Sequence, residues 1–147
     1  MTLKNRITKI QNTEELNLHS MTKLTGKVVK GFARGRLLGF PTANMELLDK
    51  DQTLPKQGVY VSLVRILDKK YESRNYFASC NLGKALTFGA TIDTIEPHLL
   101  DFNEDIYGKI IEVELIKYLR PMKKFVGQEE LKKALSIDVF DVRRFFN

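Results

Sequence analysis

A glycine-rich, basic stretch at residues 26–44 could bind a phosphate. Closely spaced glycines let the backbone approach a ligand, and cations between them suit an anion. The stretch ends with a hydroxyl at Thr42 and an amide at Asn44, following Pro41. Such neutral oxygens beside a phosphate suit Mg²⁺. The glycines and cations are Gly26, Lys27, Lys30, Gly31, Arg34, Gly35, Arg36 and Gly39.

The same glycines could instead serve ordinary turns. The sequence lacks the Gly-x-x-x-x-Gly-Lys-Ser/Thr pattern of a conventional phosphate loop. Because glycine punctuates β folds generally, spacing alone favours turns over phosphate binding by about two to one.

Glu96 is the most distinctive carboxylate in the sequence. It precedes Pro97, which holds it in an extended conformation, and its other neighbours are largely apolar. Low polarity raises the pKa of a carboxylate, which suits a general base acting on an alcohol. The pattern alone favours a solvent-facing strand glutamate by about two to one. His98 shares its face and could orient Glu96 or be structural.

Two further groups of polar residues have alternative interpretations. Asp101 and Asp105 could be ligands, but capping a turn is the favoured role. Arg120 and Phe125, with the lysines between them, could form a flap over a planar or phosphorylated ligand, or a solvated loop.

Composition predicts one cytoplasmic domain. The 147 residues are 43% hydrophobic and 29% charged, and the single cysteine, Cys80, cannot form an internal disulfide. No apolar run approaches the roughly 20 residues of a membrane span, and the first residues lack a signal peptide's apolar core. The net charge of +6 falls within residues 1–36. This basic patch suits phosphate, nucleic acid or another anion, although Lys4, Arg6 and Lys9 fit a solvated tail.

The hydrophobic pattern predicts short strands followed by a helix. Strands are expected at residues 25–32, 59–66, 74–82, 95–102 and 111–115, with a loop or irregular strand at 83–93. Apolar residues at three- and four-residue steps predict a helix over 131–146. Because strands and helices do not alternate, a small antiparallel barrel capped by a helix is favoured over a parallel sheet.

Taken together, the chain from residue 24 onward resembles the riboflavin kinase (flavokinase) family. The matching motifs are Gly26-x-Val28-Val29-x-Gly31, Arg34-Gly35-Arg36-x-Leu38-Gly39-Phe40-Pro41-Thr42-Ala43-Asn44, Gly58-Val59-Tyr60, Asn81-x-Gly83, Glu96-x-His98-x-Leu100-Asp101-Phe102, Asp105-x-Tyr107-Gly108 and Leu119-Arg120-x-x-x-Lys124-Phe125.

This resemblance implies a six-stranded antiparallel Greek-key barrel with a C-terminal helix. It implies transfer of the ATP γ-phosphate to the 5′-hydroxyl of riboflavin, giving FMN and ADP. Glu96 would be the base, Thr42 and Asn44 the Mg²⁺ ligands, and residues 31–39 and 120–125 two flaps. The implied substrate-binding residues are Gly31, Arg34, Gly35, Arg36, Gly39, Pro41, Asn81, Arg120 and Phe125.

Three departures from the family pattern are present. Residues 84–88 replace the usual Arg-Pro-Thr-Phe segment, which puts a ligand contact of that loop in doubt. Pro97 removes a backbone donor, and Met122 stands where glutamate is common in the second flap.

Residues 1–22 resemble the linker that precedes the kinase module in bifunctional bacterial FAD synthetases, with 23–147 as the kinase domain. The chain is then an excised module or an enzyme without its adenylyltransferase domain, expected to make FMN and not FAD. The alternative is a non-catalytic basic barrel that binds flavin or nucleic acid as a regulator. Retention of Thr42, Asn44 and Glu96 together favours the kinase.

Overall fold

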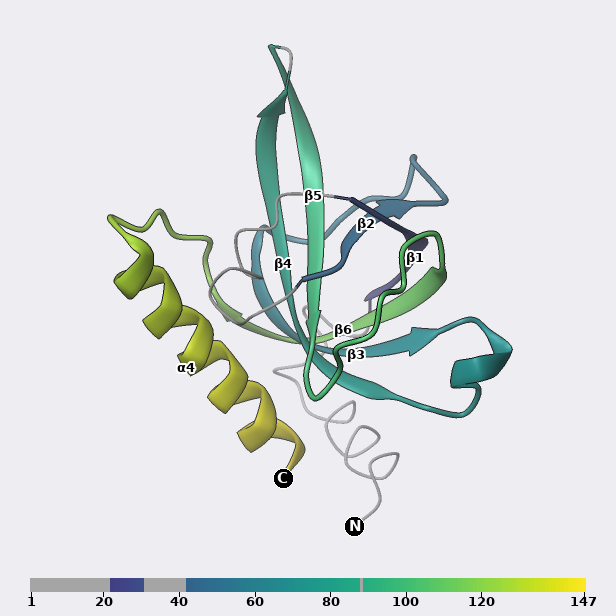
Figure 1. Cartoon of the computed structure of the whole chain (residues 1–147). Coiled ribbons are helices and arrows are strands. Elements are labelled where there is room, and N and C mark those ends of the chain that lie inside the picture. The colour runs from purple at the N-terminus through teal and green to yellow at the C-terminus, as the bar shows by residue number, and fades with distance from the viewer. Residues whose placement is uncertain (1–21, 31–41, 88) are drawn as a thin grey trace.

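The computed structural model describes residues 22–30, 42–87 and 89–147. These residues form a barrel of strands with one long helix outside it (Figure 1). The elements are β1 (Thr22–Val29), β2 (Asn44–Leu47), β3 (Gly58–Ile66), the 3₁₀ helix η1 (Lys69–Tyr71), β4 (Tyr76–Thr87), β5 (Ala90–Leu99), β6 (Ile110–Arg120) and α4 (Gln128–Phe146).

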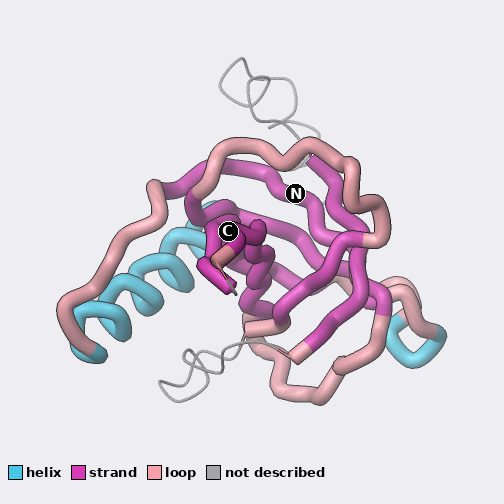
Figure 2. The backbone as a smooth tube through the Cα atoms, turned by 90° about the horizontal axis from the view of Figure 1, so that it is seen from above, coloured by secondary structure: helices cyan, strands magenta, loops and turns pink. Residues whose placement is uncertain are grey.

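The six strands form one antiparallel sheet in the order β2-β1-β6-β3-β4-β5. In this order β6 returns to lie beside β3 after the β3-β4-β5 meander, which is the Greek-key arrangement. The sheet curls until its two end strands meet, where the Ala43 amide donates to the Pro97 carbonyl at 2.8 Å. Figure 2 shows the resulting ring of strands with α4 outside. The predicted barrel and C-terminal helix are confirmed.

Alternating side chains fill the barrel interior. In β6, Ile111, Val113 and Leu115 are fully buried, whereas Glu112 and Glu114 lie on the opposite face of the strand. These apolar residues join an interior cluster that includes Tyr60 of β3 and residues of the other strands. The sequence pattern predicted this strand and its buried face correctly.

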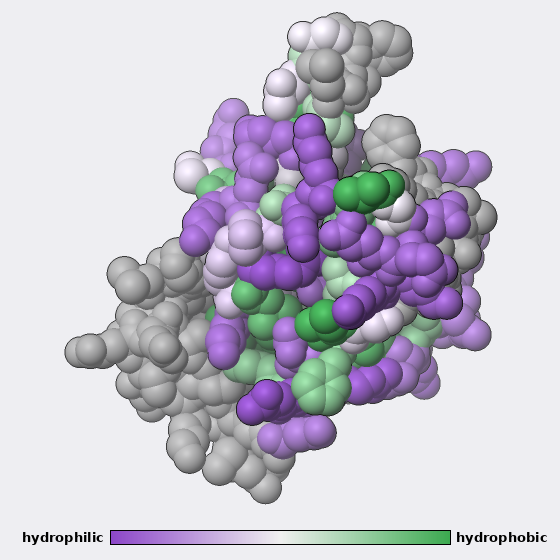
Figure 3. Space-filling view, turned by 90° about the vertical axis from the view of Figure 1, so that its left-hand side faces the viewer, coloured by the Kyte–Doolittle hydropathy of each residue, from purple (hydrophilic) through white to green (hydrophobic). Residues whose placement is uncertain are grey.

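A second apolar cluster lies between the outside of the barrel and α4. Val142 and Phe146 of the helix pack there with Val61 of β3. The Phe146 ring stacks on that of Phe77 in β4, with centroids 4.0 Å apart and planes 7° from parallel. This second layer explains why β3 is buried along both faces. The coloured surface on the α4 side is mainly hydrophilic, with hydrophobic side chains between hydrophilic ones (Figure 3). Phe140 of α4 is one of the exposed large hydrophobic residues.

The prediction of a loop or irregular strand at residues 83–93 is wrong. The described backbone continues β4 to residue 87 and starts β5 at residue 90, forming a two-stranded ribbon that projects from the barrel (Figure 1). Cross-strand pairing continues from Gly83 with Thr94 to residue 87 with residue 90, and Lys84 pairs with Asp93 at 2.9 Å. Because residues 90–93 are exposed, the first four residues of β5 lack the apolar alternation that marks a half-buried strand.

Other element boundaries shifted by a few residues. The first strand begins at Thr22 and ends at Val29, and the strand predicted at 95–102 ends at Leu99. Pro97 lies in β5, an end strand of the sheet order, as expected for a residue without an N–H donor. Among the described residues, no helix is long and apolar enough to cross a membrane.

Candidate active site

Glu96 points away from the barrel interior, toward the side that carries α4. Its neighbours Ile95 and Leu99 belong to the interior cluster, whereas Leu100 belongs to the cluster under the helix. Strand alternation therefore directs Glu96 outward. Its side chain is nevertheless half-buried, and this burial raises the pKa of Glu96 above its ordinary value of 4.5. A partly desolvated carboxylate is a stronger base toward a bound alcohol than one in water.

Asn81 and His98 share this outward face with Glu96. Asn81 of β4 lies directly opposite Glu96, and His98 lies opposite Ser79 in the next outward-facing pair. Burial lowers the pKa of His98, with the Asp138 carboxylate acting to raise it. The imidazole is therefore mainly neutral at pH 7. The face thus combines a carboxylate, an amide and an imidazole in one short stretch.

The Thr42–Asn44 segment lies beside Glu96. The bond from the Ala43 amide to the Pro97 carbonyl joins the start of β2 to β5, one residue from Glu96. Ala43 packs against the interior cluster and Met45 belongs to it, so alternation directs Asn44 between them to the outside, whereas Thr42 precedes the strand. The structure therefore brings together two parts of the predicted site that are more than fifty residues apart in sequence.

The oxygen donors at this junction fit a cation that arrives with a nucleotide. The Thr42 hydroxyl and Asn44 amide offer neutral oxygens, which Mg²⁺ accepts alongside water and phosphate. Within residues 22–30, 42–87 and 89–147, no group of three or more His, Cys, Asp or Glu side chains could hold a metal ion. Two neutral oxygens, from Thr42 and Asn44, suit a Mg²⁺ ion that is bound largely through substrate phosphates. They do not form a permanent cage of carboxylates.

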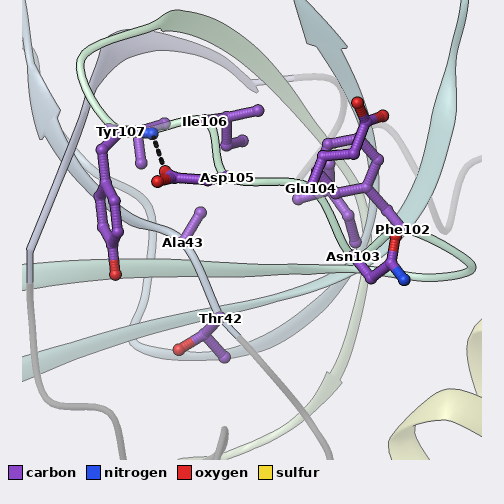
Figure 4. A pocket seen from close by; sticks show the side chains of 10 residues that line it. Thr42, Ala43, Phe102, Asn103, Glu104, Asp105, Ile106 and Tyr107 are labelled. Carbon is purple, nitrogen blue, oxygen red and sulfur yellow. Dashed lines mark hydrogen bonds between the residues drawn. The ribbon is translucent and has the colours of Figure 1, made fainter.

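A pocket of about 380 Å³ opens beside Thr42. Figure 4 shows Tyr107 on one side of it, Phe102 on the other, and Ala43 between them. The Asp105 carboxylate accepts a hydrogen bond from the Tyr107 amide at 2.9 Å and so fixes this turn, as predicted. The pocket is within the size range of small-ligand sites. It is lined by Val28, Thr42, Ala43, Leu99, Phe102, Asn103, Glu104, Asp105, Ile106 and Tyr107.

The spacing of single residues did not predict this pocket. Asp105 was expected to cap a turn, and Tyr107 had no predicted role of its own. The available signal was the family-like motif Asp105-x-Tyr107-Gly108, which places an exposed aromatic ring after a fixed turn.

Arg120, predicted in a flap, ends β6 and is bound to the C-terminal helix. Its Nε and Nη2 donate to the two carboxylate oxygens of Asp138, each at 2.8 Å. Its guanidinium carbon lies 5.9 Å from the centre of the half-buried Phe125 ring. Lys123 Nζ lies at the same distance from that ring, so the cations do gather around an aromatic residue. Asp138 was missed because a single helical aspartate carries no motif.

The other predicted binding residues lie outside the described residues. They are Gly31, Arg34, Gly35, Arg36, Gly39 and Pro41. The described part of the site therefore consists of Thr42 and Asn44, the Asn81–Glu96 pair, and Arg120 with Phe125.

Comparison with known proteins identifies the family to which this chain is similar. The riboflavin kinase (flavokinase) family model matches residues 18–146. The trifunctional protein RibF/MnmA of Mycoplasmoides gallisepticum is 40% identical over 124 residues, which cover 84% of this chain and 18% of that protein. The bifunctional riboflavin kinase/FMN adenylyltransferase of Haemophilus influenzae is 38% identical over 125 residues, 85% of this chain and 39% of that protein. The chain thus spans well under half the length of these relatives.

Solved structures show the same fold. A Streptococcus pneumoniae protein described as a macrolide-efflux protein has a TM-score of 0.77 and 33% identity, over 97% of this chain and 46% of the other. Riboflavin kinase from Trypanosoma brucei has a TM-score of 0.57 and 29% identity, over 83% of this chain and 77% of the other. With the motifs and the barrel, these matches lead to one conclusion: the chain belongs to the riboflavin kinase family.

Proposed function

We propose that this chain is a riboflavin kinase, which transfers the γ-phosphate of ATP to the 5′-hydroxyl of riboflavin to give FMN and ADP. The observation that carries the proposal is the 2.8 Å bond from Ala43 to Pro97. It holds the backbone segment that carries Thr42 and Asn44 against β5, one residue from the half-buried Glu96. A base beside cation-binding oxygens is what phosphoryl transfer to an alcohol requires.

In this mechanism Glu96 takes the proton of the 5′-hydroxyl as that oxygen bonds to the γ-phosphorus. The bond from the γ-phosphorus to the bridging oxygen breaks, and ADP leaves with the electron pair. A primary alcohol barely ionises at neutral pH, so the base is needed. The raised pKa of Glu96 strengthens it for this task.

Thr42 and Asn44 would hold Mg²⁺ with the ATP phosphates. When bound, Mg²⁺ would neutralise the charge that develops on the phosphate oxygens. The pocket beside Thr42 would receive the adenine base, because six of its ten lining residues are apolar or aromatic and Tyr107 offers an exposed aromatic ring. Asn81, Arg120 and Phe125 would contact the flavin side, and the nucleotide flap at residues 31–39 would cover the phosphates.

The experiment is to incubate the chain with riboflavin, ATP and MgCl₂ and to separate the flavins by chromatography. Equal amounts of FMN and ADP are expected. Lumiflavin, which has no ribityl hydroxyl, should give no ADP, and EDTA should stop the reaction. Absence of FMN at any metal concentration would exclude the kinase. Strongly salt-dependent nucleic-acid binding without turnover would favour a regulatory barrel instead.

We further propose that residues 1–147 make FMN but not FAD. The bifunctional relatives pair riboflavin kinase with FMN adenylyltransferase, and this chain spans 39% or less of the first two relatives compared. The sequence of residues 1–147 lacks the His-x-Gly-His type of motif expected for adenylyl transfer. Residues 1–22 would correspond to the linker between the two modules, and residues 23–147 to the kinase domain. The intact mass of the native gene product would test whether an adenylyltransferase domain is attached.

A further inference from the structure

Asp138 is a charged residue buried in the outer layer of the molecule. It lies on α4 and is 1% exposed. Both of its carboxylate oxygens accept hydrogen bonds from Arg120, in the parallel two-bond geometry that fixes a guanidinium in one orientation. A buried ion pair is seldom the most stable way to attach a helix, because desolvation offsets much of the attraction. What this pair provides is a fixed direction for Arg120.

Arg120 stands in the same cross-strand row as Glu96. Register pairs connect Arg120 to Val59 on β3, Val59 to Asn81 on β4, and Asn81 to Glu96 on β5. At about 4.8 Å per strand, three steps separate the two backbones by about 14 Å. Arg120 also donates from Nη1 to the Pro121 carbonyl at 3.2 Å. The guanidinium therefore holds the first residue of the segment that joins β6 to α4.

That segment, residues 121–127, begins over the β4–β5 ribbon. A Cβ atom built on Gly83 would lie 3.3 Å from Cε of Met122 and 3.2 Å from Oγ1 of Thr94. Gly83 and Thr94 form the outward-facing pair next to Asn81 and Glu96, about 7 Å further along the strands. The side chain of Met122 thus occupies space that Gly83 leaves free beside the proposed base.

We infer that Asp138 is a positioning residue, which holds residues 121–127 beside Glu96 through its two hydrogen bonds to Arg120. The inference rests on the proposed function, because the segment would then form one wall of the flavin site. Asp138 also acts electrostatically on His98, two residues along β5 from Glu96, and Arg143 acts on the same imidazole in the opposite sense.

The molecule contains a matched control pair. Arg143 of α4 donates from Nη1 and Nη2 to the two oxygens of Asp101, at 3.0 and 2.9 Å. This pair joins the same helix to the barrel with the same two-bond geometry, but it is exposed. Its residues lie outside the 121–127 segment. Arg143→Gln therefore removes a comparable link between helix and barrel while leaving the Arg120–Asp138 pair in place.

The test compares Asp138→Asn, Arg120→Lys and Arg143→Gln in the full chain. Hydrogen exchange of the backbone amides of residues 122–127 is measured without substrate, since Pro121 has no amide hydrogen. KM for riboflavin and for ATP is measured during FMN formation. For Asp138→Asn we expect exchange in 122–127 and the riboflavin KM to rise about tenfold or more, as for loss of a charge-assisted hydrogen bond. The ATP KM should stay within about twofold, because residues 121–127 would form a wall of the flavin site. A change of that size is what loss of an exposed ion pair typically causes. Arg143→Gln should leave all three quantities within the same limit.

Arg120→Lys keeps the positive charge but loses the planar fork, so it should raise exchange in 122–127 even if Asp138→Asn does not fold. The inference is overturned if neither variant raises that exchange, or if Arg143→Gln raises it equally, since the pair would then only dock the helix. Absence of FMN from the parent chain would refute the proposed function alone. The exchange comparison would still decide whether Asp138 positions the segment.

Discussion

Replacement of Glu96 by glutamine separates a catalytic base from a structural residue. Glutamine keeps nearly the same shape but cannot accept the proton of the riboflavin hydroxyl. A positioned base contributes about 10²–10⁴-fold, so kcat should fall by that factor, equivalent to about 3–5 kcal/mol of transition-state stabilisation. FMN formation at pH 8, followed by chromatography under saturating substrates, measures this loss.

The same substitution should leave stability unchanged or increase it. Burial raises the pKa of Glu96, so the folded state holds the proton more tightly than the unfolded state. Ionisation therefore opposes folding, and stability is lost as the pH rises from the unfolded pKa through the folded one. Glutamine has no charge to ionise. The thermal midpoint of the variant at pH 8 should equal or exceed that of the parent, and any difference should shrink below about pH 4.

The pH dependence of kcat provides the third measurement for Glu96. In the parent, kcat should rise with pH through a pKa above 4.5, because the carboxylate must be ionised to act as the base. In the glutamine variant, kcat should not show this rise with pH. Full activity in Glu96→Gln would refute the base assignment. A loss of activity with an equal loss of stability would indicate a structural role.

Four other substitutions address the metal pair, the pocket and the barrel. Thr42→Val and Asn44→Ala should each raise the Mg²⁺ concentration for half-maximal activity about tenfold or more, and an unchanged requirement would remove them as ligands. Tyr107→Ala should raise the ATP KM about fivefold or more without changing that for riboflavin, since stacking a base on an aromatic ring contributes about 1–3 kcal/mol; the reverse pattern would place the flavin there. Gly58 has φ of 151°, and a Cβ there would overlap the Tyr118 ring. Gly58→Ala should therefore lower the free energy of unfolding by about 1–3 kcal/mol in urea titrations, and a neutral result would contradict the close packing.

Elements with strong periodicity could be predicted from the sequence. The alternation of Ile111, Val113 and Leu115 with glutamates follows from one buried face and one wetter face. The three- and four-residue spacing that ends at Phe146 follows from the helix face packed on the barrel. Local pattern is sufficient where a single face is buried along the whole element.

Elements whose pairing depends on distant residues could not be predicted in the same way. β2 has only four residues, and the described start of this strand is held by Pro97 of β5. The outer half of the β4–β5 ribbon has little apolar content at its β5 end, yet it pairs to the end of both strands. Neither feature has a period that a short window of sequence could detect.

The candidate site also has parts that local sequence predicts and parts that depend on distant residues. Glu96 and the Thr42–Asn44 pair were predicted as site residues from motifs, but spacing alone favoured a solvent-facing glutamate and ordinary turns. Their proximity depends on closure of the barrel, which links segments more than fifty residues apart. Asp138 could not be identified, because its importance depends on Arg120, which precedes it on another element.

The most direct measurement of the central claim is the fate of labelled phosphate from ATP. The chain is incubated with riboflavin, Mg²⁺ and either [γ-³²P]ATP or [α-³²P]ATP, and label in the separated flavins is counted. We expect γ-label in FMN and no α-label in any flavin. Absence of γ-label from the flavins would contradict the riboflavin kinase assignment, and α-label in FAD would contradict the proposal that residues 1–147 stop at FMN.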